Sequence, residues 1–205
     1  MKITKFIHSC LLIEDNKNIL IDPGVYSTEA LDVDALPKLD YLLLTHEHAD
    51  HMDPTLVKEI VQKFSQVKVV SNPSVAELLK KEGINVETSG DSDISLEEVL
   101  HEPIFGGQVP ANTLFKVLGK LTHPGDSHHF SLSTPFLAVP IQAPWGSTVE
   151  AVKLVEKLKP EVIIPIHDWH WRDEAREGMY KRLEEYFGKA GIKFIGLETG
   201  KTVEV

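Results

Sequence analysis

Short apolar runs, bounded by polar turns, alternate with amphipathic stretches along most of the chain. Ile3–Glu14 and Ile19–Ile21 are rich in apolar and β-branched residues, and Asp15–Asn18 between them supplies turn chemistry. This pattern predicts a β-hairpin at the start of the chain. Two further short apolar runs, Tyr41–Thr45 and Val67–Val70, are also expected to be strands.

Two helices are predicted around the second of these runs. Asp53 is a suitable N-cap, Pro54 follows it at the first helical position, and apolar residues then recur on one face. The residues of this face are Leu56, Val57, Ile60, Val61 and Phe64. Asn72 and Pro73 are expected to open a second helix, which Gly83 closes.

The C-terminal part of the chain predicts two more helices. Ser147 and Glu150 fit a capping box. The residues spaced for one buried face of this helix are Val149, Val152, Val155 and Leu158. A last helix is expected over Asp173–Phe187. The residues on one side of it are Met179, Leu183 and Tyr186.

The remaining apolar runs lack helical periodicity. The strands expected among them are Ile84–Thr88, Thr113–Leu118, Phe136–Ile141, Val162–Ile166, Ile192–Ile195 and Thr202–Val205. Pro165 indicates the end or an edge of its strand, because proline cannot donate a ladder hydrogen bond. Strands interleaved with helices in each half predict sheets covered by helices. Because no repeat, linker or low-complexity tract divides the chain, we expect a single domain over residues 1–205.

Composition narrows the classes of function. The chain has 205 residues, with 31 acidic residues against 21 Lys and Arg and a formal net charge of -10. This balance argues against nucleic-acid binding, which usually requires a basic face. The apolar run near the N-terminus is interrupted by His8 and is shorter than the roughly 20 residues of a membrane span. Cys10 is the only cysteine, so we expect no internal disulfide and a cytoplasmic location. Because Cys10 lies in an apolar run, we expect its thiol to be buried.

The highest concentration of potential metal ligands follows a short apolar run, where residues 46–51 read HEHADH. In an extended loop, side chains two residues apart point to the same side, so His46 and His48 can converge on one ion. Asp50 and His51 would diverge from that pair, which favours a second metal centre close by. The helical H-E-x-x-H zinc motif is excluded, because Asp50 stands where its second histidine would be. The alternative interpretation of this cluster is a solvated turn that is rich in histidine.

Two other apolar pieces also end in potential ligands. Val162–Ile166 is followed by His167, and Phe115–Thr122 is followed by His123, with Asp126 three residues later. Sites in α/β sheets form beyond the carboxyl ends of strands. Three such ends, each delivering histidine or aspartate, favour a metal site over a solvated turn.

Taken in order, the HEHADH segment, a later isolated histidine, Gly125-Asp126-Ser127 and Pro165-Ile166-His167 resemble the metallo-β-lactamase superfamily. The resemblance spans nearly the whole chain, beginning with Ile19–Gly24, which is similar to the first motif of that family. Segments 123–126, 143–145 and 165–168 read HPGD, APW and PIHD, and are most similar to the compact hydrolase branch that includes L-ascorbate-6-phosphate lactonase-like proteins. The resemblance implies an α/β fold: an αββα sandwich of two mixed β-sheets, with helices on the outer faces.

The resemblance also implies a ligand set for two divalent metal ions, with zinc expected and manganese or iron as alternatives. The implied ligands are His46, His48 and a third histidine for the first ion, and Asp50, His51 and His167 for the second, with Asp126 bridging both. The third histidine is either His101 or His123. His101 resembles the isolated ligand of the family better, because His123 stands immediately before Pro-Gly-Asp, a place suited to supporting the bridging aspartate.

These residues imply a metal-dependent hydrolase that acts on a small molecule. A metal-bound hydroxide would cleave an ester, lactone or phosphoester bond, with Asp50 and Asp126 as the catalytic carboxylates. A nuclease or phosphodiesterase of the same superfamily is an alternative that the acidic composition disfavours. A di-iron oxidoreductase is disfavoured because it typically has glutamate where this chain has His48. A non-catalytic metal-binding protein is disfavoured by the nearly complete ligand set. The expected partner is the small-molecule substrate, and the sequence is compatible with a homo-oligomer.

Other residues beside the motifs are candidates for shaping the pocket. Asp22 could fix the orientation of a ligand histidine, although Asp-Pro-Gly is also simply a good turn. Three tryptophans could form an apolar wall for the substrate, or could be ordinary packing: Trp145, Trp169 and Trp171. Three histidines adjoin the motifs without a predicted ligand role: His8, His128 and His129.

Overall fold

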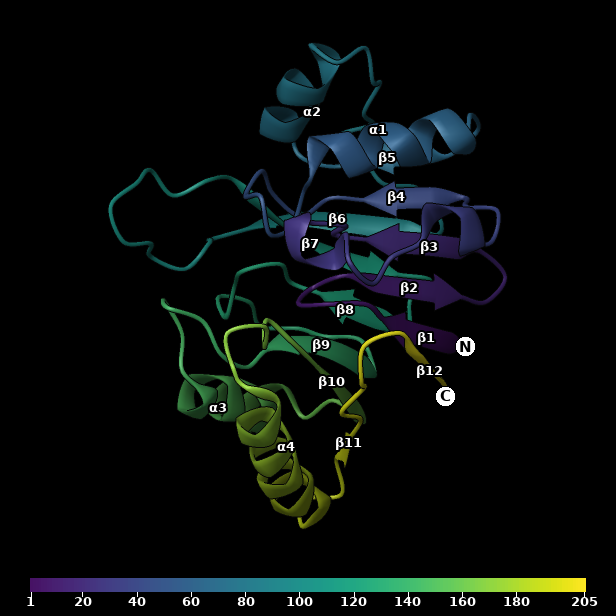
Figure 1. Cartoon of the computed structure of the whole chain (residues 1–205). Coiled ribbons are helices and arrows are strands. Elements are labelled where there is room, and N and C mark those ends of the chain that lie inside the picture. Colours follow the sequence, from purple (N-terminus) through teal and green to yellow (C-terminus); the bar gives the residue numbers. More distant parts are fainter.

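Two six-stranded mixed β-sheets lie against each other in the computed structural model, which describes residues 1–205 (Figure 1). The first sheet has the strand order β12-β1-β2-β3-β4-β5. Its strands are β1 (Lys2–Lys5), β2 (Leu11–Glu14), β3 (Asn18–Ile21), β4 (Tyr41–Leu43), β5 (Lys68–Val70) and β12 (Lys201–Glu204). The second sheet has the order β11-β10-β9-β8-β7-β6. Its strands are β6 (Ile94–Val99), β7 (Asn112–Val117), β8 (Leu121–His123), β9 (Phe136–Pro140), β10 (Val162–Ile166) and β11 (Lys193–Phe194).

Four α-helices cover the outer faces of the sheets: α1 (Pro54–Lys63), α2 (Pro73–Lys80), α3 (Thr148–Leu158) and α4 (Asp173–Gly188). Two short 3₁₀ turns, Val25–Ser27 and Val33–Ala35, precede β4. The αββα sandwich expected from the sequence is therefore confirmed. None of the helices combines the length and apolar composition that crossing a membrane requires.

Alternation of side chains along the strands builds three apolar layers. Between the two sheets, Ile13 and Ile21 belong to one cluster with Phe115 and Ile164. The other face of the first sheet packs against α1 and α2, and the other face of the second sheet packs against α3 and α4. Both sheets are therefore buried on both faces, which explains why most of their strands read as continuous apolar runs.

The helices begin where the sequence predicts. The side chain of Asp53 accepts a hydrogen bond from the Thr55 amide at 2.9 Å, that of Asn72 accepts one from the Val75 amide at 3.1 Å, and Ser147 forms its capping box with Glu150. These bonds satisfy amides that have no partner within the first turn.

The buried faces of α3 and α4 differ in part from the prediction. Val149 is 62% exposed and Tyr186 is 47% exposed. Val155 and Leu183 are buried as predicted, and Val152, Leu158 and Met179 pack against the same apolar cluster. The buried residues that the prediction missed are Ala151 and Leu154 in α3 and Phe187 in α4. Spacings of three and four residues among the buried positions define a helical face, and Val149 falls on the solvent side of it.

The predicted first strand, Ile3–Glu14, is wrong in one respect, because a tight turn divides it. The amide of Phe6 donates to the carbonyl of Cys10, the amide of Cys10 donates to the carbonyl of Ile7, and His8 has a φ of +62°. Phe6 and Cys10 are both buried, so the apolar pattern continues through the turn and hides it. The expected burial of the Cys10 thiol is confirmed, and burial raises its pKa.

The middle of the chain was the least predictable part. β6, which contains Glu97 and Glu98, was not expected as a strand and is held by its antiparallel pairing with β7. The piece Phe115–Thr122 is the hairpin of β7 and β8, closed by Leu118 and Gly119 at φ angles of +53° and +63°. Residues 84–88 make only one isolated bridge, between Glu87 and Val70.

The directions of the strands bring the predicted site residues to one edge of the two sheets. In the first sheet β1, β3 and β4 run in the same direction, and in the second sheet β6, β8 and β10 do so. Loops that follow strands of one direction emerge at one edge of a sheet. Pro165 pairs with β9, whereas β11 reaches only Val162 and Ile163. The proline therefore lies where one side of its strand has no neighbour, as predicted.

Candidate metal centre

The HEHADH loop begins three residues after the end of β4. Within it, the amides of His51 and Met52 both donate to the carbonyl of His48 at 2.9 Å. This turn folds the loop back on itself, so that the imidazole centroids of His46 and His51 lie 4.1 Å apart. Residues that are five positions apart in the sequence thus point into the same space.

The Asp22-Pro23-Gly24 segment after β3 braces this loop. The amide of Val25 donates to the carbonyl of Ala49 at 2.8 Å, and the amide of Asp53 donates to the carbonyl of Pro23 at 3.1 Å. A β-carbon on Gly24 would lie 1.9 Å from the carbonyl oxygen of Asp50. Only glycine permits this close approach, so the segment has a role in the site beyond that of a turn.

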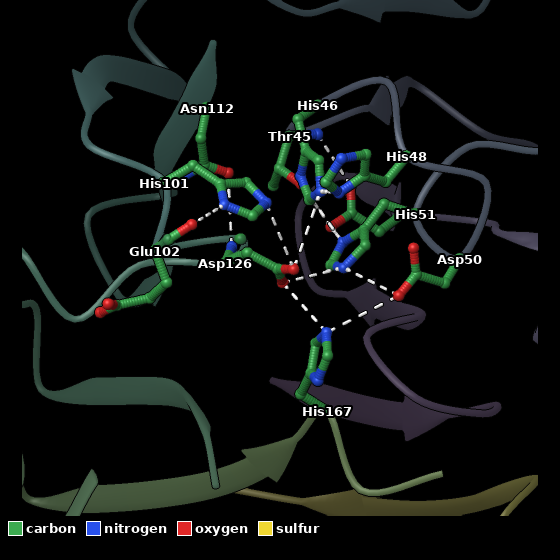
Figure 2. A network of polar contacts seen from close by, with 12 residues as sticks. Thr45, His46, His48, Asp50, His51, His101, Glu102, Asn112, Asp126 and His167 are labelled. Atoms are coloured by element: carbon green, nitrogen blue, oxygen red, sulfur yellow. Dashed lines mark hydrogen bonds and ion pairs between the residues drawn. The ribbon is translucent and has the colours of Figure 1, made fainter. Parts of the chain in front are cut away.

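One group of side chains surrounds one oxygen of Asp126, as Figure 2 shows. His46 Nε2 lies 3.8 Å and His101 Nε2 lies 3.5 Å from Asp126 Oδ2, and His48 Nδ1 lies 3.1 Å from His46 Nε2. One ligand atom from each of these four residues lies within 4.8 Å of the others. His101, two residues beyond the end of β6, is the histidine that completes this group.

A second group surrounds the other oxygen of Asp126 (Figure 2). His51 Nε2 lies 2.9 Å and His167 Nε2 lies 3.2 Å from Asp126 Oδ1. Asp50 Oδ2 lies 3.9 Å from His51 Nε2 and 3.7 Å from His167 Nε2. The carboxylate of Asp126 therefore stands between the two groups and presents one oxygen to each.

His8 joins the second group and was absent from the predicted ligand set. Its Nε2 lies 3.1 Å from Asp50 Oδ2, and its ring centroid lies 3.8 Å from that of His167. The turn that divides β1 from β2 carries His8 to this position. The carbonyl of His8 also accepts a hydrogen bond from the amide of His167 at 3.2 Å. The sequence signal was a single histidine in an apolar run, which did not reveal the turn.

Hydrogen bonds at the outer nitrogens orient three of these imidazoles. Nδ1 of His51 donates to Asp22 at 2.7 Å, Nδ1 of His101 to the carbonyl of Glu102 at 2.6 Å, and Nδ1 of His167 to the carbonyl of Gln142 at 2.9 Å. A proton on Nδ1 leaves a lone pair on Nε2. These three Nε2 atoms, together with Asp126 Oδ1, are buried and make no hydrogen bond of good geometry.

This arrangement fits two bound cations. Buried lone pairs that converge on a carboxylate repel one another unless a positive charge lies between them. Imidazole nitrogens and carboxylate oxygens are suitable ligands for zinc, and also for iron or manganese. The donor set therefore matches divalent ions of this kind on both sides of Asp126.

The pKa shifts within the cluster also favour bound cations. Burial lowers the pKa of His46 and of His48, helped by neighbouring imidazoles, so both rings are neutral and available as ligands at neutral pH. Burial also disfavours charge on His51, but the carboxylates of Asp126 and Asp22 raise its pKa well above the usual value. Burial disfavours charge on Asp126, yet His51 and His167 hold its pKa well below its ordinary range. The carboxylates thus stabilise a positive charge at this point of the site.

His123, the other candidate for the third histidine, lies outside both groups. Its Nε2 donates to the carbonyl of Ser9 at 3.0 Å, and its Nδ1 accepts a bond of 3.4 Å from the amide of Gly125. Both ring nitrogens therefore serve the fold. Gly125, at a φ of +57°, allows the loop to pass Asn112, whose side chain bonds the Asp126 amide at 3.3 Å.

A cleft of about 440 Å³ opens above both groups. Trp145 lines it, with its ring centroid 5.0 Å from that of His167. Of the other two tryptophans, Trp169 stacks on Tyr26 and Trp171 packs against the apolar layer of α3 and α4. A larger hollow of about 830 Å³ lies at the ends of α3 and α4 and contains none of the clustered histidines.

The histidines at residues 128 and 129 are held by Glu102. Glu102 Oε1 accepts from the backbone amide of His128 at 3.1 Å, and Glu102 Oε2 lies 3.2 Å from Nε2 of His129. Nε2 of His128 lies 2.9 Å from the carbonyl of Pro140. These contacts tie together two loops at the rim of the site.

Comparisons with known proteins agree on one superfamily. The model of a beta-lactamase superfamily domain matches residues 2–167. A UPF0173 protein from Pyrococcus furiosus is 29% identical over 199 residues, which cover 90% of this chain and 91% of that protein. A UPF0173 metal-dependent hydrolase from Nanoarchaeum equitans is 28% identical over 229 aligned positions, which cover 100% of both chains. The solved structure of Igni18, a metallo hydrolase from Ignicoccus hospitalis, has the same fold, with a TM-score of 0.73 at 23% identity over 98% of this chain and 97% of that one.

Proposed function

This chain belongs to the beta-lactamase superfamily and is a metal-dependent hydrolase, and we propose that it cleaves an ester, lactone or phosphoester bond in a small molecule at a pair of divalent ions. His46, His48 and His101 would hold one ion, and Asp50, His51 and His167 the other, with Asp126 shared between them. When bound, such ions supply an activated water at neutral pH and polarise the substrate oxygen that receives negative charge.

The observation that carries the proposal is the position of Asp126. Its two oxygens face two separate groups of buried imidazoles, at distances from 2.9 Å to 3.8 Å. A single structural ion needs only one closed set of ligands. Two groups that share one carboxylate and open into one cleft are instead the arrangement expected of a two-ion hydrolase.

Asp50 is suited to orient the attacking water. Its side chain lines the cleft and is 24% exposed, whereas Asp126 is almost fully buried. Burial opposes ionisation of Asp50, but the hydrogen bond with His8 and the nearby His51 hold its pKa well below the ordinary range. Asp50 is therefore a carboxylate at neutral pH and can accept a hydrogen bond from water while His8 fixes its other side.

The partner we propose is one small molecule in the cleft. A net charge of -10 disfavours association with nucleic acid. The buried, unpaired Cys10 agrees with a reducing cytoplasm, which we propose as the location of the protein.

The test is turnover of metal-reconstituted protein on a panel of esters, lactones and phosphoesters. Asp126→Asn is expected to lose more than about a hundredfold in kcat, because the shared carboxylate is removed without a change of size. Asp53→Asn is the matched control, since asparagine also caps helices and Asp53 caps α1 outside the site. Equal turnover by the Asp126→Asn variant and the wild type would contradict the proposal.

A further inference from the structure

The cleft has a polar floor and apolar walls. The floor consists of four side chains from the two groups: His48, Asp50, Asp126 and His167. The walls are Pro103, Ile104, Phe105, Pro144 and Trp145. No lysine, arginine, serine, threonine, asparagine or glutamine lines the cleft. Apart from the floor, its side chains carry no charge, and the indole N–H of Trp145 is their only hydrogen-bonding group.

The walls come from two loops on either side of the floor. Phe105 belongs to the loop between β6 and β7, which projects beyond the sheets (Figure 1), and its side chain is fully exposed. Gly106, at a φ of +77°, shapes the turn that follows this residue. Trp145 lies on the loop between β9 and α3, and its ring centroid is 6.2 Å from that of His101. A bound group would therefore lie against exposed aromatic surface immediately above the floor.

This lining distinguishes between the substrate classes that the proposed function leaves open. A phosphomonoester carries up to two charges, and protein sites for phosphate usually add arginine, lysine or amide donors to any metal. The cleft has no such side chain, and the chain as a whole has a net charge of -10. A hydrocarbon group gains affinity from burial against apolar walls, by roughly fourfold for each fully buried methylene.

Resting on the proposed function, we infer that the substrate is an uncharged ester or lactone whose apolar group, several carbons long, packs against Phe105 and Trp145. Hydrolysis adds one water across the acyl carbon–oxygen bond. The carbonyl carbon keeps the water oxygen and yields a carboxylic acid, which ionises at neutral pH. The leaving oxygen takes a proton and becomes an alcohol, which departs from an ester and stays in the opened chain of a lactone. The volume of about 440 Å³ lies within the range of pockets for small molecules.

The test compares p-nitrophenyl acetate, butyrate and octanoate with p-nitrophenyl phosphate on the metal-loaded protein. The inference predicts that kcat/KM rises about two- to fourfold per methylene from acetate to butyrate, and that the phosphate is the poorest substrate. Phe105→Ser should reduce the ratio of octanoate to acetate turnover at least about fivefold, because it removes apolar wall against which the longer chain packs. Val109→Ser, an exposed residue of the same loop that does not line the cleft, should leave this ratio unchanged.

Binding of the free carboxylates gives a readout that does not depend on turnover. Octanoate should bind the metal-loaded protein at least about tenfold more tightly than acetate, and Phe105→Ser should remove most of this difference. Equal rates for all acyl lengths, equal binding of the two carboxylates, or a preference for the phosphate would overturn the inference. Turnover of the phosphate alone would overturn the inference but agree with the proposed function. Absence of turnover on every substrate, with metal bound, would contradict the proposed function, and the binding of the carboxylates would then decide the inference.

Discussion

The carboxylate of Asp22 accepts a hydrogen bond from Nδ1 of His51 across 2.7 Å, at a point where both residues are fully buried. The same carboxylate accepts bonds from the amide and the hydroxyl of Thr45, at 2.8 Å and 2.7 Å. Asp22 has no partner in the cleft, yet it decides which nitrogen of His51 is free to face Asp126. Asp22, the first residue after β3, thus orients an imidazole in the loop that follows β4.

Asp22→Asn is predicted to weaken metal binding at the group of His51 by about 10- to 100-fold. Asparagine tolerates the φ of +49° found at this position, so the turn should survive. Its amide group, however, places a donor either at the oxygen that accepts from Nδ1 of His51 and the hydroxyl of Thr45, or at the oxygen that accepts from the amide of Thr45. A competition titration with a chromophoric chelator measures the affinity. An affinity equal to that of the wild type would show that Asp22 serves only the turn.

The two candidate third histidines are predicted to fail in different ways. His101→Ala should lose about one bound ion per chain, because His101 faces Asp126. When both proteins are free of metal, the variant should unfold near the temperature of the wild type, since only one nitrogen of His101 bonds the backbone. His123→Ala should bind both ions but lose about 2–4 kcal/mol of unfolding free energy, since it leaves the carbonyl of Ser9 buried without its donor and creates a cavity. The opposite pattern in metal content and thermal unfolding would exchange their roles.

The fold was largely predictable because both sheets are buried on both faces. Continuous apolar runs with clear caps, such as the one at Asp53, mark strands and helices independently of their partners. β6 escaped prediction because its glutamates give it weak local strand character, and only its pairing with β7 makes it a strand. The turn at His8 escaped because burial keeps its flanking residues apolar, so no glycine or proline announces it.

For the site, the sequence allowed the residues to be predicted, but not how their side chains are oriented. The spacing of His46, His48, Asp50 and His51 predicts two centres, and all seven residues of the expected ligand set lie in the two groups around Asp126. The place of His8 beside Asp50 depends on a turn and on the approach of β1 to β10, which no local pattern encodes. The same holds for the hydrogen bonds that fix each imidazole.

A buried ion pair behind His167 is predicted to matter for stability. Nζ of Lys5 lies 2.7 Å from Asp168 and also donates to the carbonyl of Pro165 at 3.0 Å. Lys5→Met removes the nearest cation from the buried carboxylate of Asp168, whose remaining partners are the hydroxyl of Tyr180 and the more distant Arg176, and should cost about 3–5 kcal/mol of unfolding free energy. Lys2→Met, on an exposed position of the same strand, should change it by less than about 0.5 kcal/mol.

Urea denaturation of these two variants measures the difference. Replacing both members of the pair by apolar residues, in Lys5→Met with Asp168→Leu, should recover much of the loss, because no charge is then left buried. If Lys5→Met and Lys2→Met unfold at the same urea concentration, the pair makes no net contribution to stability.

Metal removal is predicted to lower the thermal stability of the protein. The unpartnered Nε2 atoms of His51, His101 and His167 meet around Asp126, so ions bound there stabilise the folded chain alone. An ion at about 100 times its dissociation constant adds about 2.7 kcal/mol. Calorimetry before and after dialysis against a chelator should show a lower Tm for the stripped protein, recovered when zinc or manganese is returned. A Tm unaffected by the chelator would argue against ions at this site.

The most direct test of the central claim is the number of ions that the wild-type chain binds. Protein stripped by chelation, reconstituted with excess divalent metal and freed of unbound ions on a desalting column can be examined by elemental analysis. The position of Asp126 between two groups of imidazoles predicts about two ions per chain. A ratio near zero would contradict the metal centre itself, and a ratio of about one under saturating metal would contradict the sharing of Asp126 by two ions.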